Sequence, residues 1–237
     1  MNTKVNCSAC AAVCPKECIK IEYNGDGFLR PFTDEAECIQ CGLCERVCPM
    51  EYVKSSALDD GVLYAAWGDV EDCKQSLSGG IAARLASYAV SHGYEVCGAV
   101  LDYDTLHVKH ILINKETDLD VLRGSKYLQS NVVSAFREIL KELRSTSEKK
   151  YFIFGTLCQI ARFRKVLEQK SLLDRVVLID IFCHGVPTNH LWEKYKNWIM
   201  RKIKLNSFGD IQNVTFRDKS YSWHEYFTKI ESGGQPM

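Results

Sequence analysis

Residues 38–49 read CIQCGLCERVCP, a run of four cysteines that ends in a Cys-Pro pair. The spacing Cys38-x2-Cys41-x2-Cys44-x3-Cys48 is that of thiolates that hold [4Fe–4S] clusters. In chains with two such runs, three cysteines of a run bind one cluster and the fourth binds the neighbouring cluster. The spacing therefore predicts that this part of the chain folds about iron–sulfur clusters and carries single electrons.

A second cysteine run precedes this one and departs from the pattern at one position. It reads Cys7-x2-Cys10-x3-Cys14, again followed by proline, and Lys4 stands where a complete run has a further cysteine. Another cysteine, Cys18, follows four residues later. The two runs predict two clusters, one of which lacks an obvious fourth ligand.

The crossover between runs assigns the remaining ligands. Cys14 joins the first three cysteines of the later run, and Cys48 joins Cys7 and Cys10. The open iron of this second cluster can take Cys18, a solvent ligand, or nothing, which would leave a three-iron cluster. We expect Cys18, because it lies nearby in the sequence and has no other evident task. The expected ligands of the two clusters are Cys7, Cys10, Cys14, Cys18, Cys38, Cys41, Cys44 and Cys48.

Disulfide bonds and zinc sites are two further uses of clustered cysteines. Residues 1–10 lack the apolar core of a signal peptide, which argues against the oxidising compartments where disulfides form. Zinc sites usually combine two separated Cys-x2-Cys pairs, often with histidine, and no histidine precedes His92. The spacing favours iron–sulfur clusters over both.

The composition is that of a globular protein, with 46% hydrophobic residues, 25% charged residues and a formal net charge of zero. A neutral chain offers no electrostatic footprint for nucleic acid. No stretch of 18 apolar residues is present, so we expect no membrane span. Reduced cysteines in this number predict a cytoplasmic protein, and oxygen-sensitive clusters indicate an anaerobic setting.

The order of predicted elements indicates two domains. Residues 1–55 read as an α+β, ferredoxin-like iron–sulfur domain with two [4Fe–4S] clusters, and residues 56–75 as a connector. Residues 76–237 read as a mixed α/β domain, with an N-terminal part over 76–150 and the start of a C-terminal part over 151–237. Expected strands are 19–23, 28–32, 62–67, 96–102, 106–113, 151–155, 176–182, 214–218 and 226–230; expected helices are 81–92, 132–144, 190–204 and, after a loop, part of 156–168.

Several loops of the second domain are candidate binding sites. Ser78-Gly79-Gly80 precedes a helix, an arrangement that suits a phosphate, although a plain helix-start turn has the same pattern. Cys158 and Cys183 each follow a hydrophobic strand, which places both thiols at the ligand edge of an α/β sheet; the alternative is two small core residues.

Taken together, the cysteine runs and several segments of the second domain resemble the β-subunit family of coenzyme F-420 (deazaflavin) hydrogenases and dehydrogenases. The N-terminal run is similar to the two-cluster ferredoxin domain that often precedes this family. The matching segments are Ser78–Gly80, Arg123-Gly124-Ser125-Lys126-Tyr127, Gly155-Thr156-Leu157-Cys158-Gln159-Ile160-Ala161, Asp180–Pro187 and Phe216-Arg217-Asp218-Lys219.

The resemblance implies an iron–sulfur flavoprotein, in which FAD exchanges electron pairs and the clusters pass single electrons. It implies that Cys158 and Cys183 help to ligate a third cluster, which would be incomplete here. Family members usually continue beyond Met237, so we expect the flavoprotein-type domain to be truncated at its C-terminus. The resemblance also implies cofactor-binding roles for Ser78, Gly79, Gly80, Lys126, Gly155 and Thr156.

The predicted function is an oxidoreductase that links a low-potential carrier, such as ferredoxin or another redox protein, to a small-molecule hydride acceptor. One alternative is a non-catalytic electron-transfer subunit that docks on a partner enzyme. Another is a bacterial homologue tied to polysaccharide biosynthesis. No residue of the sequence stands out as a general acid or base, so the catalytic residues stay unassigned.

Overall fold

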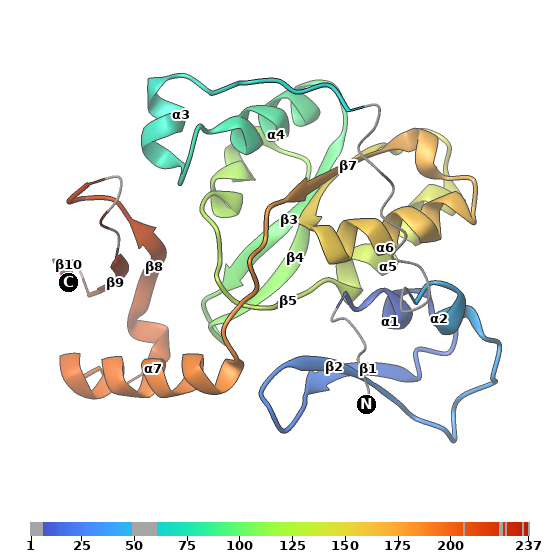
Figure 1. Cartoon of the computed structure of the whole chain (residues 1–237), viewed down its shortest axis with the longest axis horizontal. Coiled ribbons are helices and arrows are strands. Elements are labelled where there is room, and N and C mark those ends of the chain that lie inside the picture. The colour runs from blue at the N-terminus through green and yellow to red at the C-terminus, as the bar shows by residue number, and fades with distance from the viewer. Residues whose placement is uncertain are drawn as a thin grey trace.

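A mixed five-stranded sheet forms the centre of the molecule, with the N-terminal iron–sulfur segment on one side and a smaller sheet on the other (Figure 1). In this computed structural model the described residues are 7–48, 61–205, 207–222, 225, 227–233 and 235–236. Lys4 and the expected domain boundary at residue 55 lie outside these residues.

The N-terminal segment is a β-hairpin with two short helices. The hairpin pairs Ile19 with Thr33 and Tyr23 with Leu29. Its turn is held by the side chain of Asn24, whose Oδ1 accepts a hydrogen bond from the Phe28 amide at 2.9 Å. The strands expected over residues 19–23 and 28–32 are thus confirmed. The elements are α1 (Ala9–Val13), β1 (Ile19–Tyr23), β2 (Leu29–Thr33) and α2 (Leu43–Arg46).

The central sheet has the strand order β5-β4-β3-β6-β7. A tight turn joins β3 to β4 as an antiparallel hairpin, whereas β6 and β7 are added in parallel through a helical crossover. The strands expected around residues 96–113 and after residue 150 are thus confirmed. The bounds are β3 (Glu95–Asp102), β4 (His107–Ile113), β5 (Ser130–Asn131), β6 (Tyr151–Thr156) and β7 (Val176–Ile181).

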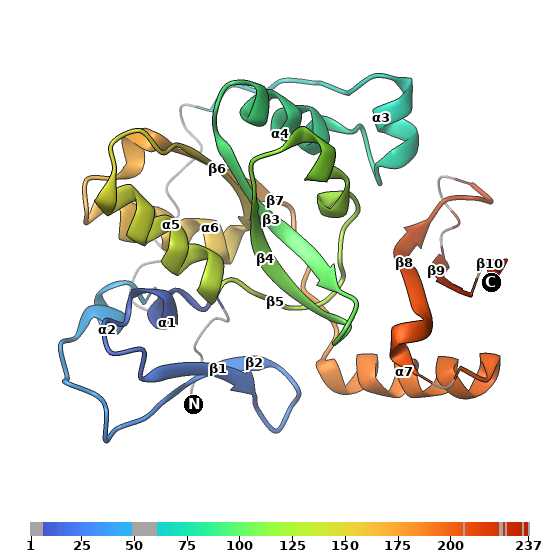
Figure 2. The ribbon, with the colours of Figure 1, turned by 180° about the vertical axis from the view of Figure 1, so that it is seen from behind.

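Helices cover both faces of this sheet (Figure 2). On one face α5 (Val133–Ser145) and α6 (Leu157–Glu168) enclose the main core, where the rings of Phe136 and Phe163 stack at 4.0 Å. Full burial of each such ring contributes roughly 1.5–3 kcal/mol. The other face packs on α4 (Ile81–Ser91) and the 3₁₀ helix η1 (Glu116–Leu122).

The main core extends into the iron–sulfur segment. Ala12 of α1 and Val47, which follows α2, are both buried within the same apolar cluster as Phe136 and Phe163. Helix α1 packs against both α5 and α6. The N-terminal segment is therefore attached to the α/β part by a shared core and not only by the chain.

The C-terminal part crosses to the opposite side of the molecule. There Trp192 is 5% exposed, and its Nε1 donates to the carbonyl oxygen of Leu106 at 2.9 Å. The two final expected strands are confirmed as members of a three-stranded antiparallel sheet. The elements of this part are α7 (Asn189–Ile203), η3 (Phe208–Asp210), β8 (Ile211–Asp218), β9 (Phe227–Ser232) and β10 (Gln235–Pro236), whereas η2 (Leu173–Arg175) lies between α6 and β7.

The expected strand over residues 62–67 is wrong. These residues run without a strand partner toward α3 (Val70–Gln75), and Leu63 is 97% exposed. An apolar run forms a strand only where a neighbour can satisfy its backbone, and none lies beside it in the described chain. Among the described residues no helix has both the length and the apolar character needed to cross a bilayer.

Candidate iron–sulfur centre and cofactor cleft

Cys14 and Cys18 close the turn between α1 and β1, and their Sγ atoms are 3.4 Å apart. Cys38 lies next to Cys18, and all three pack around Ala11 and Ile19. The hydrogen bond with Cys14, together with burial, raises the pKa of Cys18 to about 12. Burial opposes ionisation of Cys14, but hydrogen bonds from Cys18 and from backbone amides outweigh it and lower the Cys14 pKa. Cys14 is therefore the readier thiolate of this pair.

A second group of thiols forms around Cys7. Burial raises the pKa of Cys10 to about 11, and the nearby charges of Cys7, Cys48 and Cys44 act in the same direction. Two cysteines of the later run, Cys44 and Cys48, thus act on Cys10 of the earlier run. The crossover of Cys48 to Cys7 and Cys10 stays a prediction from the spacing.

The two groups divide the expected ligands unevenly. Cys14, Cys18 and Cys38 lie together. Cys18 is therefore placed with Cys14 and Cys38, whereas the sequence analysis assigned it to the cluster of Cys7 and Cys10. The assignment of Cys18 to the Cys7 cluster stays a prediction that this placement does not favour. Cys41 is exposed beside α2, and Cys44 lies within α2.

The thiols of the chain are available as metal ligands. All twelve cysteines are free of disulfide bonds. Within the part of the chain that is described, no three cysteine, histidine or carboxylate side chains converge as ligands of a single metal ion would. A cubane differs because its irons share a sulfide core and each takes its own thiolate.

The Ser78-Gly79-Gly80 loop does not present an open phosphate cradle. Gly80 has a φ of 75°, and a Cβ placed on it would lie 2.8 Å from Cβ of Asp72. A Cβ on Gly79 would meet Trp67 at 3.3 Å. The space that the two glycines leave is filled by the chain's own α3 and the residues before it.

Asp72 forms ion pairs with two arginines beside this loop. Its carboxylate pairs with Nε of Arg84 at 2.5 Å and with Nη2 of Arg123 at 3.1 Å. Lys126, expected near the cofactor, donates instead to the carbonyl oxygens of residues 121, 122 and 123 at 3.0–3.1 Å. Burial lowers the pKa of Lys126 to about 8. All three N–H groups of its ammonium therefore bind carbonyl oxygens at the C-terminal end of η1.

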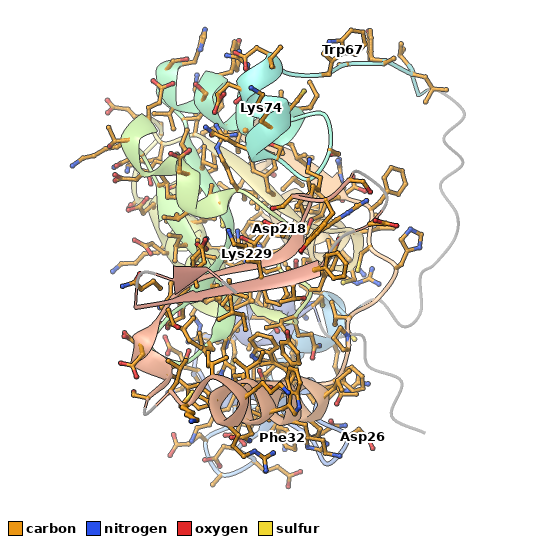
Figure 3. All side chains as sticks on the ribbon, turned by 90° about the vertical axis from the view of Figure 1, so that its left-hand side faces the viewer. Asp26, Phe32, Trp67, Lys74, Asp218 and Lys229 are labelled. Atoms are coloured by element: carbon orange, nitrogen blue, oxygen red, sulfur yellow. The ribbon has the colours of Figure 1, made fainter. Side chains whose placement is uncertain are left out.

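An open cleft of about 660 Å³ lies next to the loop. It presents an indole ring and two lysines, a combination that suits a ring system with a charged tail. Trp67 and Lys74 lie at the end of the molecule opposite the hairpin residues Asp26 and Phe32 (Figure 3). The cleft is lined by Trp67, Gly68, Asp69, Val70, Cys73, Lys74 and Lys219. No periodic signal in the sequence indicates it, because its lining comes from an irregular segment and a distant strand end.

The turn after β6 is built from the residues that the resemblance singled out. Oε1 of Gln159 accepts hydrogen bonds from the amide and the hydroxyl of Thr156, at 3.0 and 3.1 Å. A Cβ on Gly155 would approach the same Oε1 at 3.2 Å. Gly155 and Thr156 therefore shape the start of α6, whether or not a cofactor lies beside them.

Cys158 and Cys183 leave the same edge of the sheet. Thr156 and Ile181 are paired in register, and each cysteine follows its strand by two residues. Their surroundings differ, since Cys158 is half-buried and Cys183 is exposed. Sequence reasoning missed Arg162, one turn after Cys158, whose guanidinium lies close enough to Cys7 to affect its pKa. The spacing of four residues on a helix was the available signal.

Comparison with known proteins identifies the N-terminal segment. Residues 5–52 match the 4Fe-4S dicluster domain family. No curated protein matches the chain. A solved chain of the F420-reducing [NiFe] hydrogenase complex from Methanosarcina barkeri is similar at 20% identity and a TM-score of 0.48, over 70% of this chain and 55% of that chain. This protein thus spans about half the length of that one. The cysteine spacing, the grouped thiols and the family match agree that residues 5–52 form a 4Fe-4S dicluster domain.

Proposed function

We propose that this chain is an iron–sulfur flavoprotein oxidoreductase that passes electrons between [4Fe–4S] clusters and FAD. The observation that carries the proposal is the attachment of a 4Fe-4S dicluster domain to an α/β domain with an open cleft. Ala12 and Val47 of the dicluster domain are buried in the core of the α/β domain. Electron carrier and candidate cofactor site therefore belong to one packed unit.

The proposed ligand sets follow from the spacing of the cysteines. Cys38, Cys41, Cys44 and Cys14 would hold one cluster, and Cys7, Cys10 and Cys48 would supply three ligands of the other. The clusters would transfer single electrons. The protein's part is to bury the thiols, as it does for Cys7, and to set the charges around them.

FAD would occupy the cleft beside the loop before α4. When bound, a flavin accepts a hydride or electron pair and releases electrons one at a time. The ammonium groups of Lys74 and Lys219 would offset the charge of its phosphates, and Trp67, 74% exposed, offers a ring for stacking. Because the glycines themselves are covered by α3, we place the cofactor next to the loop and not on it.

The partners follow from this chemistry. The clusters would exchange electrons with ferredoxin or another low-potential redox protein, and the flavin with a small-molecule hydride acceptor. Coenzyme F-420 is the acceptor that the sequence resemblance suggests. We place the protein in the cytoplasm of an anaerobe, where reduced thiols and oxygen-sensitive clusters persist.

Flavin content tests the proposal. The protein would be produced anaerobically, reconstituted with iron, sulfide and FAD, and freed of unbound flavin by gel filtration. We expect close to one FAD per chain, and a large loss of flavin in Trp67→Ala and Lys74→Ala. Lys141→Ala, on the exposed side of α5, is the matched control and should bind as the parent does. Absence of flavin from a protein with intact clusters would overturn the flavoprotein assignment.

A second candidate function is electron transfer to a partner enzyme without catalysis by this chain. It is favoured by the exposed apolar side chains before α3, because such patches often mark protein interfaces. Val62, Leu63 and Tyr64 are 71%, 97% and 86% exposed. A flavin-free protein whose clusters are reduced and reoxidised by ferredoxin would support this second function.

A further inference from the structure

We propose that the surface around Cys41 is the docking site for an electron-transfer protein whose own surface is basic. This surface comprises residues 32–46, from the end of β2 through α2. The docking site rests on the iron–sulfur part of the proposed function and is independent of the flavin. It names the cluster that faces the partner and the charge that the partner carries.

Cys41 is the most accessible of the predicted cluster ligands. All eight ligands are among the described residues, and only Cys41 is exposed. Cys7, a predicted ligand of the other cluster, is 6% exposed, and α1, which follows it, packs against α5 and α6. Electrons tunnel faster over shorter distances, so a partner that approaches from solvent exchanges them fastest with the cluster that includes Cys41.

The segment between β2 and α2 projects away from the rest of the molecule in both views of the ribbon (Figure 1, Figure 2). Residues 32–37 and 39–41 are exposed. They include two large apolar side chains, since Phe32 is 45% exposed and Ile39 is 57% exposed. Electron-transfer interfaces are small, and apolar side chains within a polar rim form the centre of a protein interface. Ile39 lies two residues before Cys41, so apolar contact and cluster ligand belong to one short stretch.

The rim of this surface is acidic, although the chain as a whole is neutral. Within the described chain none of its exposed carboxylates forms an ion pair. The one basic residue of the segment is Arg46, whose Nη2 donates to the carbonyl oxygen of Cys41 at 3.4 Å. Unpaired carboxylates around a cluster ligand favour a partner with lysines or arginines around its own redox centre. The acidic residues are Asp34, Glu35, Glu37 and Glu45.

A second copy of this chain is a less suitable occupant than a basic partner. In a two-fold dimer the same surface meets itself, so the carboxylates of both copies would face one another. Like charges that are brought together at an interface oppose binding. A basic partner is attracted instead. One electron would pass from the reduced cluster to the oxidised centre of the partner, with no bond formed or broken and no proton moved.

Anaerobic stopped-flow kinetics test the docking site. The reconstituted protein, reduced with dithionite and freed of excess reductant, would be mixed with a c-type cytochrome that has a basic surface. We expect the second-order rate constant to fall as ionic strength rises, because salt screens the attraction. The double variant Glu35→Lys/Glu37→Lys should react about tenfold more slowly at low ionic strength and lose most of this salt dependence.

Asp104→Lys/Asp118→Lys is the matched control. Both aspartates are exposed, one on the turn between β3 and β4 and the other on η1, so the net charge changes equally but away from Cys41. This variant should react at close to the rate of the parent. Equal slowing of the two double variants would overturn the docking site, as would a parent rate that does not change with ionic strength.

Cross-linking keeps the test decisive if Glu35→Lys/Glu37→Lys loses iron, since both residues lie near Cys38 in the sequence. A carbodiimide would join carboxylates of the reconstituted parent directly to lysines of the cytochrome, and peptide mass analysis would locate the bonds. We expect them within residues 34–45. Cross-links confined to other parts of the chain, such as η1 or α7, would contradict the docking site.

Oxidation by a neutral quinone separates failure of the docking site from failure of the proposed function. The parent and both double variants should keep their iron and reduce the quinone at equal rates, because no charged surface is involved. Clusters that reduce the quinone but react with the cytochrome regardless of charge would overturn the docking site alone. A protein that binds no clusters would instead refute the proposed function.

Discussion

The guanidinium of Arg137 in α5 donates a hydrogen bond of 2.8 Å to the carbonyl oxygen of Ala11 in α1, 126 residues earlier in the chain. The same side chain forms an ion pair of 2.8 Å with Glu17. Ala11 lies near the end of a short helix, where carbonyl groups lack partners within the helix. One arginine therefore joins the dicluster domain to the α/β domain at a point that needs a donor.

Replacing Arg137 with Met should loosen this attachment. The change removes a charge-assisted hydrogen bond and leaves the Ala11 carbonyl unsatisfied, at a cost of about 1.5–3 kcal/mol. Glu17→Gln is the control: Glu17 is 67% exposed, and loss of a surface pair costs at most about 1 kcal/mol. Anaerobic urea unfolding curves of the three proteins measure the difference. Equal midpoints for both variants would show that the Ala11 bond adds nothing.

Gly80→Ala should destabilise the protein more than Gly93→Ala. Both glycines have a positive φ, 75° and 77°, so each alanine loses about 1–2 kcal/mol from the backbone alone. Only at Gly80 would the new Cβ also meet Asp72, whereas nothing lies within 4 Å at Gly93. Thermal unfolding followed by circular dichroism should therefore show a clearly larger loss for Gly80→Ala. A smaller loss than for Gly93→Ala would refute the packing of α3 on the loop.

Buried His110 should make the fold sensitive to acid. It is 5% exposed, its Nε2 lies 3.1 Å from the carbonyl oxygen of Phe154, and burial lowers its pKa to about 4. In the unfolded chain the imidazole titrates near 6.5, so as pH falls from 6.5 to 4 only the unfolded state gains the proton. Stability contributed by the neutral ring is complete above pH 6.5 and decreases by about 2 kcal/mol by pH 5.

His110→Gln separates this effect from acid loss of the clusters, because glutamine does not titrate. The free energy of unfolding should fall less steeply between pH 7 and pH 5 in the variant than in the parent, even if the variant is less stable at pH 7. Parallel pH profiles would show that His110 protonates equally in both states.

Removal of the clusters should unfold residues 7–48 and leave the central sheet folded. The apolar centre of the hairpin is small, formed by Ala11, Cys18 and Ile19 with partly buried neighbours, and metal binding supplies much of the stability of such segments. Hydrogen exchange after chelation of iron should lose protection in β1 and β2 but not in β3 and β6. Retained protection of β1 and β2 would show that the shared core alone holds them.

Local patterns predicted local structure well. The strands expected over residues 19–23 and 28–32 correspond to β1 and β2, and the helix expected over residues 81–92 corresponds to α4. The same reasoning failed at residues 62–67, since an apolar run does not reveal whether a partner strand will exist. The crossover of Cys48 to Cys7 and Cys10 stays a prediction from the cysteine spacing.

Contacts between distant segments could not be predicted from the sequence. No sequence pattern near Ala11 indicates its hydrogen bond with Arg137, and none near Cys7 indicates that Arg162 affects its pKa. The expectation that Lys126 faces a cofactor came from the family resemblance, whereas the structure places its ammonium on three backbone carbonyls. Side-chain roles of this kind depend on which elements come together, a property of the whole fold.

The depth of Cys7 has a consequence for how the protein matures in the cell. Cys7 is buried just before α1, which packs against α6, and the hairpin that follows α1 is fixed by Gln129, whose Oε1 accepts a hydrogen bond from the Leu29 amide 100 residues away. Iron and sulfide therefore reach Cys7 only in a state in which this cover is open. The cysteine runs precede α6 in the chain, so during synthesis they leave the ribosome before the helix that α1 packs against.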